Sequence, residues 1–516
     1  MSTHPLIAVI GTTGVGKSRL AVDLAQALSS GLHHWKRGRV LNADAMQVYQ
    51  GLDIITNKIS EEEKCGIEHC LMAFKEPGNE YVVGEWINDA TSLIEKSHKE
   101  QVLPIVAGGT LYWVQHLIFP DRLASNLSVN LQGLSPNEYP TPSNTLHAAL
   151  STLPDNLATI YSALPDRGSV SSLSEQEAFE LHSLLSHIDP DMGSRWHWRD
   201  SRKILRSLEI TKETGLRASE VVNLQDSQPS LPRFRTLIFW IYADREKLEP
   251  RLDDRVDTML TSGLISELIH LRRIASKLPS TEQKPDFTQG IFQAIGYKEF
   301  SAYLSQLPPE DPTPSSIPWT SPSFIAGLES MKLSTKQYAK KQIKWINNRL
   351  IPAVNASSLL YMRKRGASGE VAELAQTGAQ LYLLDATELG DAWETNVRDV
   401  AVSIMNKFLN DEEMPNPLTT SDAARRMLNV ETTSLRPTEV LQARRKRICM
   451  VCTTDPARPM MLEEGREWEI HIKTRAHRNR DGRDKHMEDI KRRREEALLR
   501  AAQRTEVTVS SGDALG

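Results

Sequence analysis

The chain has few cysteines and lacks any long apolar run. Only 4 of its 516 residues are cysteine, too few for a disulfide scaffold, which favours a reducing compartment. The longest clear apolar stretch, Leu237 to Ala243, is far shorter than the roughly 18 residues that a membrane-spanning helix needs. An apolar strand expected from Leu6 leaves no room for a secretory signal or a long transit peptide. We therefore expect a cytoplasmic protein without a membrane segment, with mitochondrial or nuclear pools left open.

Positive and negative charges nearly balance over the whole chain, but a C-terminal stretch has an excess of positive charge. The whole chain has 62 Lys and Arg against 66 Asp and Glu, whereas residues 441–504 hold 18 Lys and Arg against 11 Asp and Glu. This basic stretch predicts either a module that meets a polyanion or a solvated basic helix without a partner. Charge alone favours neither.

Short apolar segments alternate with helical patterns. Leu6–Ile10 is followed by a Gly-rich turn and by Ser18–Leu28, whose leucines recur every four residues. Two further strands are expected at Arg39–Asn42 and Leu103–Ala107. A further strand is expected at Leu237–Ala243. Helices are expected at Asp200–Gly215, Lys247–Ile274 and Thr335–Leu350. This alternation predicts an α/β fold with a parallel sheet and flanking helices.

A glycine-rich loop joins the first expected strand to the first helix. It has the pattern G-x-x-x-x-G-K-S, in which backbone N–H groups and a helix N-terminus converge on phosphate oxygens. The alternative is a merely structural glycine turn. The strand–loop–helix context favours a phosphate or diphosphate site, with Mg²⁺ on the serine, formed by Gly11, Thr12, Thr13, Gly14, Val15, Gly16, Lys17 and Ser18.

The second expected strand ends beside Asp44. In a parallel sheet this strand end faces the same crevice as the phosphate loop. A single carboxylate there suits a general base acting on a second substrate, although helix capping explains it equally well. A P-loop kinase or NTPase would need an acidic residue at the end of a later strand, and the strand ending at Ala107 runs into Gly108-Gly109-Thr110 instead.

The basic C-terminal stretch holds two cysteines and two histidines, Cys449, Cys452, His471 and His477. Two thiolates and two imidazoles fit a closed, tetrahedral structural Zn²⁺ site, and we expect both histidines on one face of a helix that starts near Trp468. The alternative is two unrelated pairs of residues. The surrounding basic residues are expected to contact phosphates: Arg444, Arg445, Lys446, Arg447, Lys473, Arg475, Arg478 and Arg480.

Taken together, these residues resemble the tRNA dimethylallyltransferase (isopentenyltransferase) family. Residues 44–49 are similar to its D-S-M-Q-V-Y motif, with Ala45 in place of Ser. Residues 108–112 look like its G-G-T-x-x-Y, compressed as in eukaryotic members. Residues 200–209 look like its D-x-R-R-x-x-R-A-L-E. Further matches lie at 56–58, 66–69, 255–257, 293–299 and 338–342. The Cys/His pattern resembles the Cys2His2 finger of eukaryotic members.

The resemblance implies transfer of a dimethylallyl group from dimethylallyl diphosphate to the exocyclic amine of the adenine 3′ of the tRNA anticodon. It implies Asp44 as the base, with Thr110 and Arg206 also catalytic, and Arg202 and Lys203 on the diphosphate. Contacts with the anticodon stem-loop are implied for Asp44, Ala45, Met46, Gln47, Arg202, Lys203, Ile204, Leu205 and Arg206. The family-based expectation is a monomer.

Three other functions are weighed against this one. A kinase or NTPase would need an acidic residue at the end of a later strand, and the strand ending at Ala107 has none. An isopentenyltransferase acting on free adenine nucleotides should not need a finger or a basic tail. A purely RNA-binding protein would not need the phosphate loop and Asp44.

The expected domain order follows from these motifs. A P-loop NTPase-like core has its first part at 1–120 and its second part at 191–410, which carries a helical extension and a Pro-rich loop at 307–323. A mainly helical, tRNA-gripping insertion is expected at 121–190. The C-terminal part comprises a linker at 411–440, a small Cys2His2 zinc-finger module at 441–485, and a basic helix with a disordered tail at 486–516.

Overall fold

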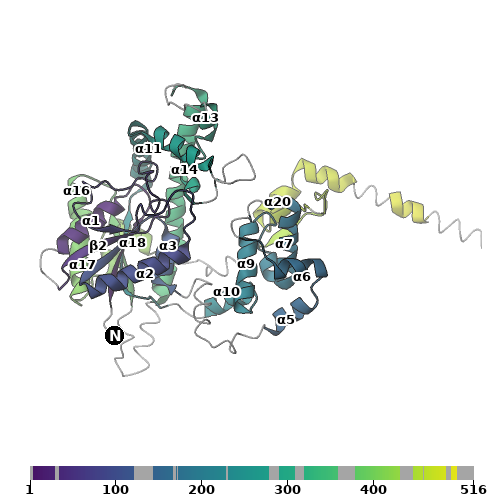
Figure 1. The fold of residues 1–516 in the computed structure, drawn as a ribbon, viewed down its shortest axis with the longest axis horizontal. Helices are drawn as coiled ribbons and strands as arrows, with labels where there is room; N and C mark the ends of the chain where they lie inside the picture. The colour runs from purple at the N-terminus through teal and green to yellow at the C-terminus, as the bar shows by residue number, and fades with distance from the viewer. Residues whose placement is uncertain are drawn as a thin grey trace, which may run out of the picture. The chain divides into compact units, whose positions relative to one another are not determined.

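A computed structural model gives the fold of the chain (Figure 1). The structure describes residues 4–28, 34–120, 143–166, 170, 173–227, 231–277, 287, 290–307, 319–357, 378–429, 445–456, 458–483 and 490–496. Most of the expected Pro-rich loop, part of the 411–440 linker and the tail beyond 496 lie outside these residues. The described residues divide into two compact units, one drawn from Met1–Leu127 and Ser227–Ser434 and the other from Ser128–Asp226 and Leu435–Gly516.

The first unit is built on a six-stranded parallel sheet with the order β3-β2-β4-β1-β5-β6. This confirms the expected parallel sheet. The strands are β1 (Pro5–Gly11), β2 (Arg37–Asn42), β3 (His69–Cys70), β4 (Val102–Ala107), β5 (Arg235–Tyr242) and β6 (Ala379–Asp385). The first strand lies centrally between β4 and β5, so the loop that follows it opens at the middle of the sheet.

Both faces of the sheet are buried, and β1 shows why. Leu6, Ala8 and Ile10 point into one hydrophobic cluster, whereas Ile7 and Val9 point into another, as the two-residue period of a strand requires. Helices α2 (Val83–Lys99) and α3 (Leu111–Ile118) supply side chains to the first cluster. Helices α1 (Lys17–Ala27) and α17 (Asp399–Leu409) supply the second and lie side by side (Figure 1).

The second half of this unit is mainly helical. The pattern expected as one helix at Lys247–Ile274 forms two, α11 (Arg245–Thr261) and α12 (Leu264–Ala275), because Gly263 has a φ of 107° that breaks the helix. The helix expected at Thr335–Leu350 is the end of a longer one, α14 (Pro322–Trp345), continued by η7 (Ile346–Leu350). The remaining elements are η5 (Gly290–Gln293), α13 (Ser301–Gln306), α16 (Asp391–Trp393), η9 (Glu394–Arg398), η10 (Pro417–Thr419) and α18 (Asp422–Leu428).

The second unit is a helical bundle to which the C-terminal module is attached. Its helices are α5 (Asn144–Ser151), α6 (Asp155–Ser162), α7 (Glu175–Ile188), α8 (Pro190–Gly193), α9 (Ser201–Thr214) and α10 (Ala218–Ser227). The helical insertion was expected to end at residue 190, but the helical unit extends to Asp226. Ile204 and Leu208 of α9 share a hydrophobic core with Leu181 and Leu185 of α7, so α9 belongs with the helical unit and not with the sheet.

The C-terminal module contains β7 (Lys446–Ile448), β8 (Met461–Glu463) and α20 (Arg466–Ile472). It packs on the bundle: Trp198 Nε1 donates to the carbonyl of Pro459 at 3.1 Å, and Arg445 pairs with Asp191 at 3.1 Å. Among the described residues, no helix is both long and apolar enough to cross a bilayer.

A glycine at the end of β4 gives a test of the sheet packing. A Cβ added at Gly108 would lie 2.2 Å from the backbone carbon and oxygen of Ala43, which cannot move without breaking the sheet. We expect Gly108→Ala to lower the free energy of unfolding by about 1–3 kcal/mol, measured from the urea unfolding midpoint.

Gly84 in the first turn of α2 is the matched control. An added Cβ there meets no atom within 4 Å, so Gly84→Ala should be neutral or stabilising by less than about 1 kcal/mol. Equal destabilisation by the two substitutions would contradict the packing argument.

Candidate active site

The phosphate loop connects β1 to α1 in the first unit. Gly14 and Gly16 have φ values of 80° and 89°, which L side chains rarely adopt, and Gly16 is the N-cap of α1. The loop therefore turns its backbone N–H groups around the helix N-terminus, as anion binding requires. Lys17 Nζ donates to the carbonyl of Thr12 at 2.6 Å.

Three strand ends meet beside this loop. The N–H of Ala43, after β2, donates to the carbonyl of Ala107 at 2.8 Å, and the N–H of Gly108, after β4, donates to Val9 of β1 at 3.2 Å. Thr110 then donates its N–H to the carbonyl of Ala43, and its Oγ1 accepts the N–H of Ala45 at 2.9 Å. Thr110 thus holds the Asp44 turn in place.

The contacts of Asp44 are compatible with both interpretations of its position, a helix cap and a general base. Its Oδ1 accepts the N–H of Met46 at 2.9 Å, as a capping residue does. A methyl group built on Gly109 would lie 3.6 Å from Asp44 Oδ2 and 3.8 Å from Lys17 Nζ. The second carboxylate oxygen and the ammonium group therefore lie on the same side of Gly109, the side to which a Cβ would point, so the carboxylate lies near Lys17 of the phosphate loop.

Two side chains of α14 connect the phosphate loop to the Gly-Gly-Thr turn. Gln342 accepts the N–H of Thr13 on its Oε1 and donates its Nε2 to the carbonyl of Gly109, both at 2.9 Å. Tyr338 donates its hydroxyl to the same carbonyl at 3.3 Å. Burial, and then the charge of Asp44, raise the pKa of Tyr338, so this phenol stays a neutral donor.

A second cation reaches the loop from α11. Arg255 donates its Nη1 to Thr13 Oγ1 at 2.8 Å. Burial lowers the pKa of Arg255, and the carboxylate of Asp44 partly opposes that effect. Burial also lowers the pKa of Lys17 to about 8, with Asp44 raising it and Arg255 lowering it. Two cations thus lie at one loop with one carboxylate near both, a charge arrangement that suits a polyanionic ligand.

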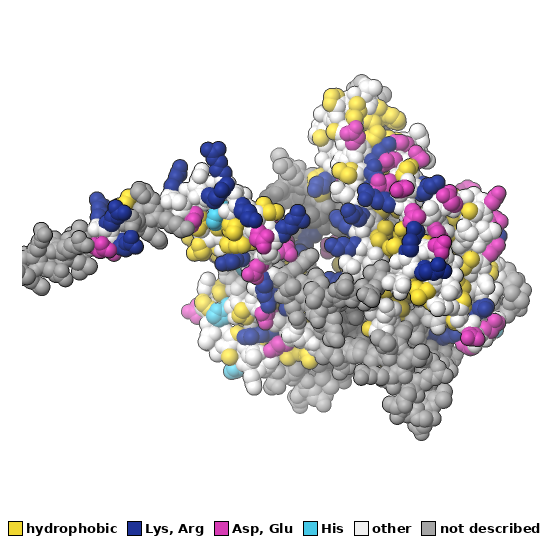
Figure 2. Space-filling view, turned by 180° about the vertical axis from the view of Figure 1, so that it is seen from behind, with side chains coloured by type: hydrophobic (Ala, Val, Ile, Leu, Met, Phe, Trp, Pro, Cys, Tyr) yellow, Lys and Arg dark blue, Asp and Glu magenta, His cyan; other side chains and the backbone are white. Residues whose placement is uncertain are grey.

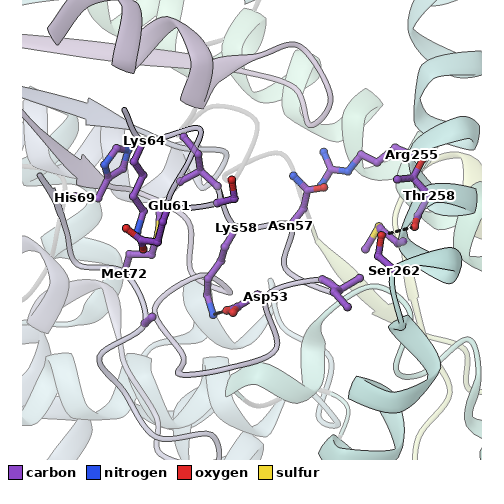
Figure 3. A pocket seen from close by; sticks show the side chains of 15 residues that line it. Asp53, Asn57, Lys58, Glu61, Lys64, His69, Met72, Arg255, Thr258 and Ser262 are labelled. Carbon is purple, nitrogen blue, oxygen red and sulfur yellow. Dashed lines mark hydrogen bonds and ion pairs between the residues drawn. The ribbon is translucent and has the colours of Figure 1, made fainter. Parts of the chain in front are cut away.

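Arg255 also lines a cavity of about 640 Å³ between α11 and the segment after β2 (Figure 3). Its walls carry polar groups, among them Asn57 and Ser262, and apolar ones such as Met72 and Met259. This volume is in the range of small-ligand sites. Gln47 supports one wall, because its Nε2 donates to the carbonyls of Thr56 and Asn57 at 3.1 Å.

The basic residues expected at the diphosphate lie on α9 in the helical unit. Arg206 pairs with Glu209 at 3.1 Å and Glu213 at 3.3 Å, and Lys203 pairs with Asp200 at 3.2 Å. Ile204 and Leu205, expected to contact tRNA, are instead buried in the bundle core, at 0% and 1% exposure. Their side chains hold α9 in the bundle and do not face solvent.

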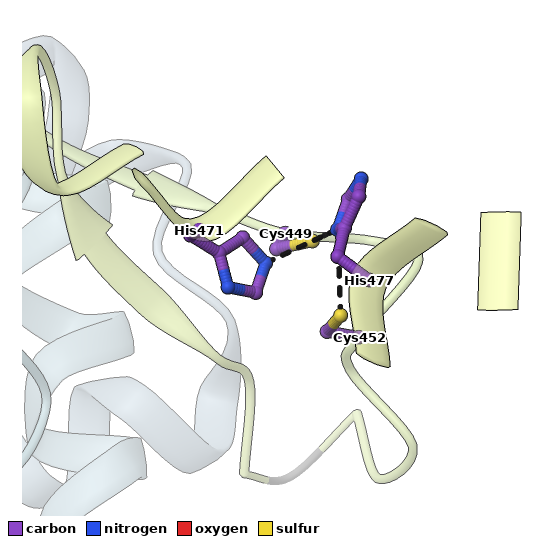
Figure 4. Close-up of side chains that lie close together, drawn as sticks. All are labelled: Cys449, Cys452, His471 and His477. Carbon is purple, nitrogen blue, oxygen red and sulfur yellow. Dashed lines mark hydrogen bonds between the residues drawn. The ribbon is translucent and has the colours of Figure 1, made fainter. Parts of the chain in front are cut away.

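The two cysteines and two histidines of the C-terminal module converge (Figure 4). The four ligand atoms all lie within 4.8 Å of one another, and His477 Nδ1 is 3.4 Å from Cys449 Sγ and 3.2 Å from His471 Nε2. Around one tetrahedral zinc ion, donors would be about 3.3–3.8 Å apart, given bonds of about 2.0–2.3 Å. The donor set and its spacing therefore fit zinc.

The two histidines were expected on one face of a single helix, but they lie on two separate helical stretches. His471 belongs to α20, which ends at Ile472, and His477 lies in a second helical stretch, residues 475–483. The hydroxyl of Thr474 accepts the N–H of His477 at 3.2 Å and so caps this second stretch. A spacing of six residues puts two side chains on different faces of a continuous helix, and the break brings them together.

Exposed basic side chains surround this cluster. Figure 2 shows Lys and Arg gathered over the C-terminal module and the stretch that follows it. The exposed ones in the described residues include Arg447, Arg458, Arg466, Lys473, Arg475, Arg478, Arg480 and Arg483. Such a surface suits contact with a phosphate backbone.

Sequence reasoning assigned no role to Arg255, Tyr338 or Gln342. All three lie in segments that carry the family resemblance, at 255–257 and 338–342. Their sequence separation from Thr13, 242 residues for Arg255 and 329 for Gln342, is invisible to local periodicity. The signal present in the sequence was their place in these matching segments, which did not say what each side chain contacts.

The lowered pKa of Lys17 predicts weaker anion binding at high pH. Below about pH 8 the ammonium is charged and attracts a diphosphate, and above it the amine becomes neutral. We expect the Kd for magnesium pyrophosphate, measured by calorimetry, to rise by up to about tenfold per pH unit above pH 8. Lys17→Arg is the control, because a guanidinium stays charged while pyrophosphate titrates identically. The same pH dependence in both proteins would exclude Lys17 as its source.

Comparison with known proteins agrees with this geometry. Residues 47–349 match the model of the IPP transferase family. A tRNA dimethylallyltransferase of Schizosaccharomyces pombe is 34% identical over 92% of this chain and 94% of its own, and one of Mus musculus is 30% identical over 92% and 85%. A crystal structure of a eukaryotic dimethylallyltransferase acting on tRNA has a TM-score of 0.66 and 28% identity, covering 95% of this chain and 99% of its own. The chain therefore belongs to the IPP transferase family.

Proposed function

We propose that this protein transfers the dimethylallyl group of dimethylallyl diphosphate to the exocyclic amine of the adenine 3′ of a tRNA anticodon. The observation that carries the proposal is the approach of Asp44 and Lys17 to Gly109, directly beside the phosphate loop. A base and an anion site next to each other at one turn suit a reaction in which a proton and a diphosphate both leave.

The donor half of the reaction rests on the loop. As the bond between the allylic carbon and the diphosphate oxygen breaks, negative charge grows on the departing diphosphate. Lys17, Arg255 and the N-terminus of α1 stabilise that charge. Mg²⁺ fits the same place, because the Ser18 hydroxyl and diphosphate oxygens are the hard ligands it prefers, and it would supply further charge neutralisation when bound.

The acceptor half rests on Asp44. As the amine nitrogen of adenine bonds to the allylic carbon, its proton passes to the carboxylate, which lies on the same side of Gly109 as Lys17 of the loop. Thr110 holds the turn that carries Asp44. Gln47 reads the adenine through its amide oxygen, because its amide nitrogen already donates to Thr56 and Asn57. The target base leaves its stack to reach this site, at a cost of a few kcal/mol.

We propose that the helical unit and the C-terminal module bind the tRNA backbone. Arg202, Lys203 and Arg206 on α9, with the exposed basic residues of the module, supply phosphate contacts that depend on salt. Cys449, Cys452, His471 and His477 hold a structural Zn²⁺ that fixes the module. The thiolates of such a site suit a reducing compartment, so we place the protein in the cytoplasm, with mitochondrial or nuclear pools in addition, and acting as a monomer.

The decisive test is Asp44→Asn. The amide keeps the shape and the hydrogen bond to Met46 but cannot take a proton, so we expect turnover to fall by about 10²–10⁴-fold. Purified protein, Mg²⁺, dimethylallyl diphosphate and unmodified tRNA are combined, and N6-isopentenyladenosine is quantified by nucleoside mass spectrometry.

Two measurements complete the test of Asp44. Filter binding of tRNA should give the wild-type constant, and calorimetry should show that the variant still binds magnesium pyrophosphate, which separates catalysis from binding. Full turnover by Asp44→Asn would remove Asp44 from the role of base. Product from AMP but not from tRNA with the wild-type protein would refute the assignment of the acceptor.

The metal assignment predicts the behaviour of Cys449→Ser. Loss of one of four ligands should reduce bound zinc from about one atom per chain to near zero, measured by elemental analysis. Because the module would lose its fixed shape, the Michaelis constant for tRNA should rise while that for dimethylallyl diphosphate stays unchanged. Cys65→Ser, which removes an exposed free thiol, is the control and should keep its zinc. Equal zinc in the two variants would contradict the ligand assignment.

A further inference from the structure

A tryptophan from the C-terminal part of the first unit packs against the phosphate loop. Trp393 is 1% exposed and ends α16, beyond the 47–349 range of the family match. A Cβ added at Gly16 would lie 2.6 Å from Cη2 and 2.7 Å from Cζ3 of this indole. The six-membered ring thus fills the space that a side chain at Gly16 would occupy.

Two residues of α1 hold the indole in this place. Trp393 Nε1 donates to Asp23 Oδ2 at 3.0 Å, and the guanidinium carbon of Arg19 lies 4.7 Å from the ring centroid. Both residues lie one or two turns after Gly16. The indole is therefore bonded to the helix whose N-terminus forms the anion site, and it touches the residue that caps that helix.

The segment that carries Trp393 is also fixed to the sheet and to α11. Strand β6 pairs with β5 from Thr236↔Ala379 to Tyr242↔Asp385. After β6, Thr387 Oγ1 accepts the N–H of Asp244 at 3.0 Å, and Arg251 of α11 donates to the carbonyl of Ala386 at 2.8 Å. Residues 379–409 thus contact both elements that bring cations to the site, the loop with Lys17 and the helix with Arg255.

We propose that Trp393 is a positioning residue for the diphosphate site, through which residues 379–409 fix the phosphate loop. The inference rests on the proposed function of that loop as the donor site. The indole acts on Gly16 and not on substrate. Its ring prevents the Gly16 turn from relaxing outward, so the N–H groups at the start of α1 keep the direction that the diphosphate needs.

The test uses a mild substitution in the full-length protein. Phenylalanine is shorter, so Trp393→Phe leaves a gap against Gly16 and loses the bond to Asp23 but keeps an apolar ring. We expect the KM for dimethylallyl diphosphate and the Kd for magnesium pyrophosphate to rise on the order of tenfold, as small misplacements of binding groups do. The KM for tRNA should stay within about twofold of wild type, because the change concerns only donor binding.

The bond to α1 is tested separately. Asp23→Ala removes the acceptor of the indole N–H and should raise the donor constants in the same direction. Asp23→Asn keeps an acceptor oxygen and should restore them to wild-type values. A merely structural role for Trp393 would not give this pattern.

Phe408→Ala is the matched control for loss of core packing. Phe408 is also 1% exposed and belongs to the same hydrophobic cluster, but its ring lies 4.2 Å from the guanidinium of Arg235, the first residue of β5. It therefore packs at the end of the sheet opposite the phosphate loop. We expect Phe408→Ala to lower the unfolding temperature and leave the donor constants unchanged.

Several results would overturn the proposal: unchanged donor constants in Trp393→Phe, a parallel rise in the constants for donor and tRNA, or an equal donor effect in Phe408→Ala. Pyrophosphate binding needs no turnover. A wild-type protein that binds pyrophosphate but does not prenylate tRNA would refute the proposed function alone, so the two failures are distinguishable.

Discussion

The site depends on the side-by-side pairing of three parallel strands, β2, β4 and β1. Because all three run in one direction, their carboxyl ends lie at one edge, and the peptide groups after them bond to each other: Ala43 to Ala107, and Gly108 to Val9. Only glycine fits at Gly108, where the backbone of Ala43 leaves no space for a Cβ. These hydrogen bonds and the close approach at Gly108 bring the turn with Asp44 next to the turn with Gly109, and both next to the phosphate loop.

Charge balance at this edge follows from burial. Lys17 and Arg255 are both partly buried, which alone disfavours their charged forms, and the carboxylate of Asp44 favours them. The two cations and the single carboxylate leave a net positive site, which suits the proposed diphosphate. The neutral groups at the same place, Gln342 and Tyr338, fix the geometry by hydrogen bonds and add no charge. In the proposed reaction Asp44 thus acts as the base, and the cations and neutral donors around it bind the anion.

The sequence allowed prediction of the parts of this site that are local. Strand periodicity with glycine spacing is sufficient to find the phosphate loop. Asp44 stands out because it follows a strand, but only the family resemblance favoured a base over a helix cap. Arg255 and Gln342 could not be placed, because their contacts with Thr13 depend on how α11 and α14 pack on the sheet. Similarly, the histidines of the C-terminal module were identified, but the helix break at Thr474 that joins them was not. The boundary at residue 190 was misplaced because α9 has an amphipathic pattern that fits either unit, and only its packing on α7 decides.

The C-terminal module packs on the helical bundle, and this packing joins two distant parts of the chain into the second unit. More than 200 residues separate Trp198 from Pro459 in sequence, yet the indole N–H of the first bonds to the carbonyl of the second. Arg445 and Arg458 pair with Asp191 and Glu175 of the bundle, so ion pairs to acidic residues of the bundle help to hold the basic module. The remaining basic side chains face outward, where a phosphate backbone can reach them. The bundle and the module are therefore one compact unit built from two distant parts of the chain, and its basic surface suits the proposed contacts with the tRNA backbone.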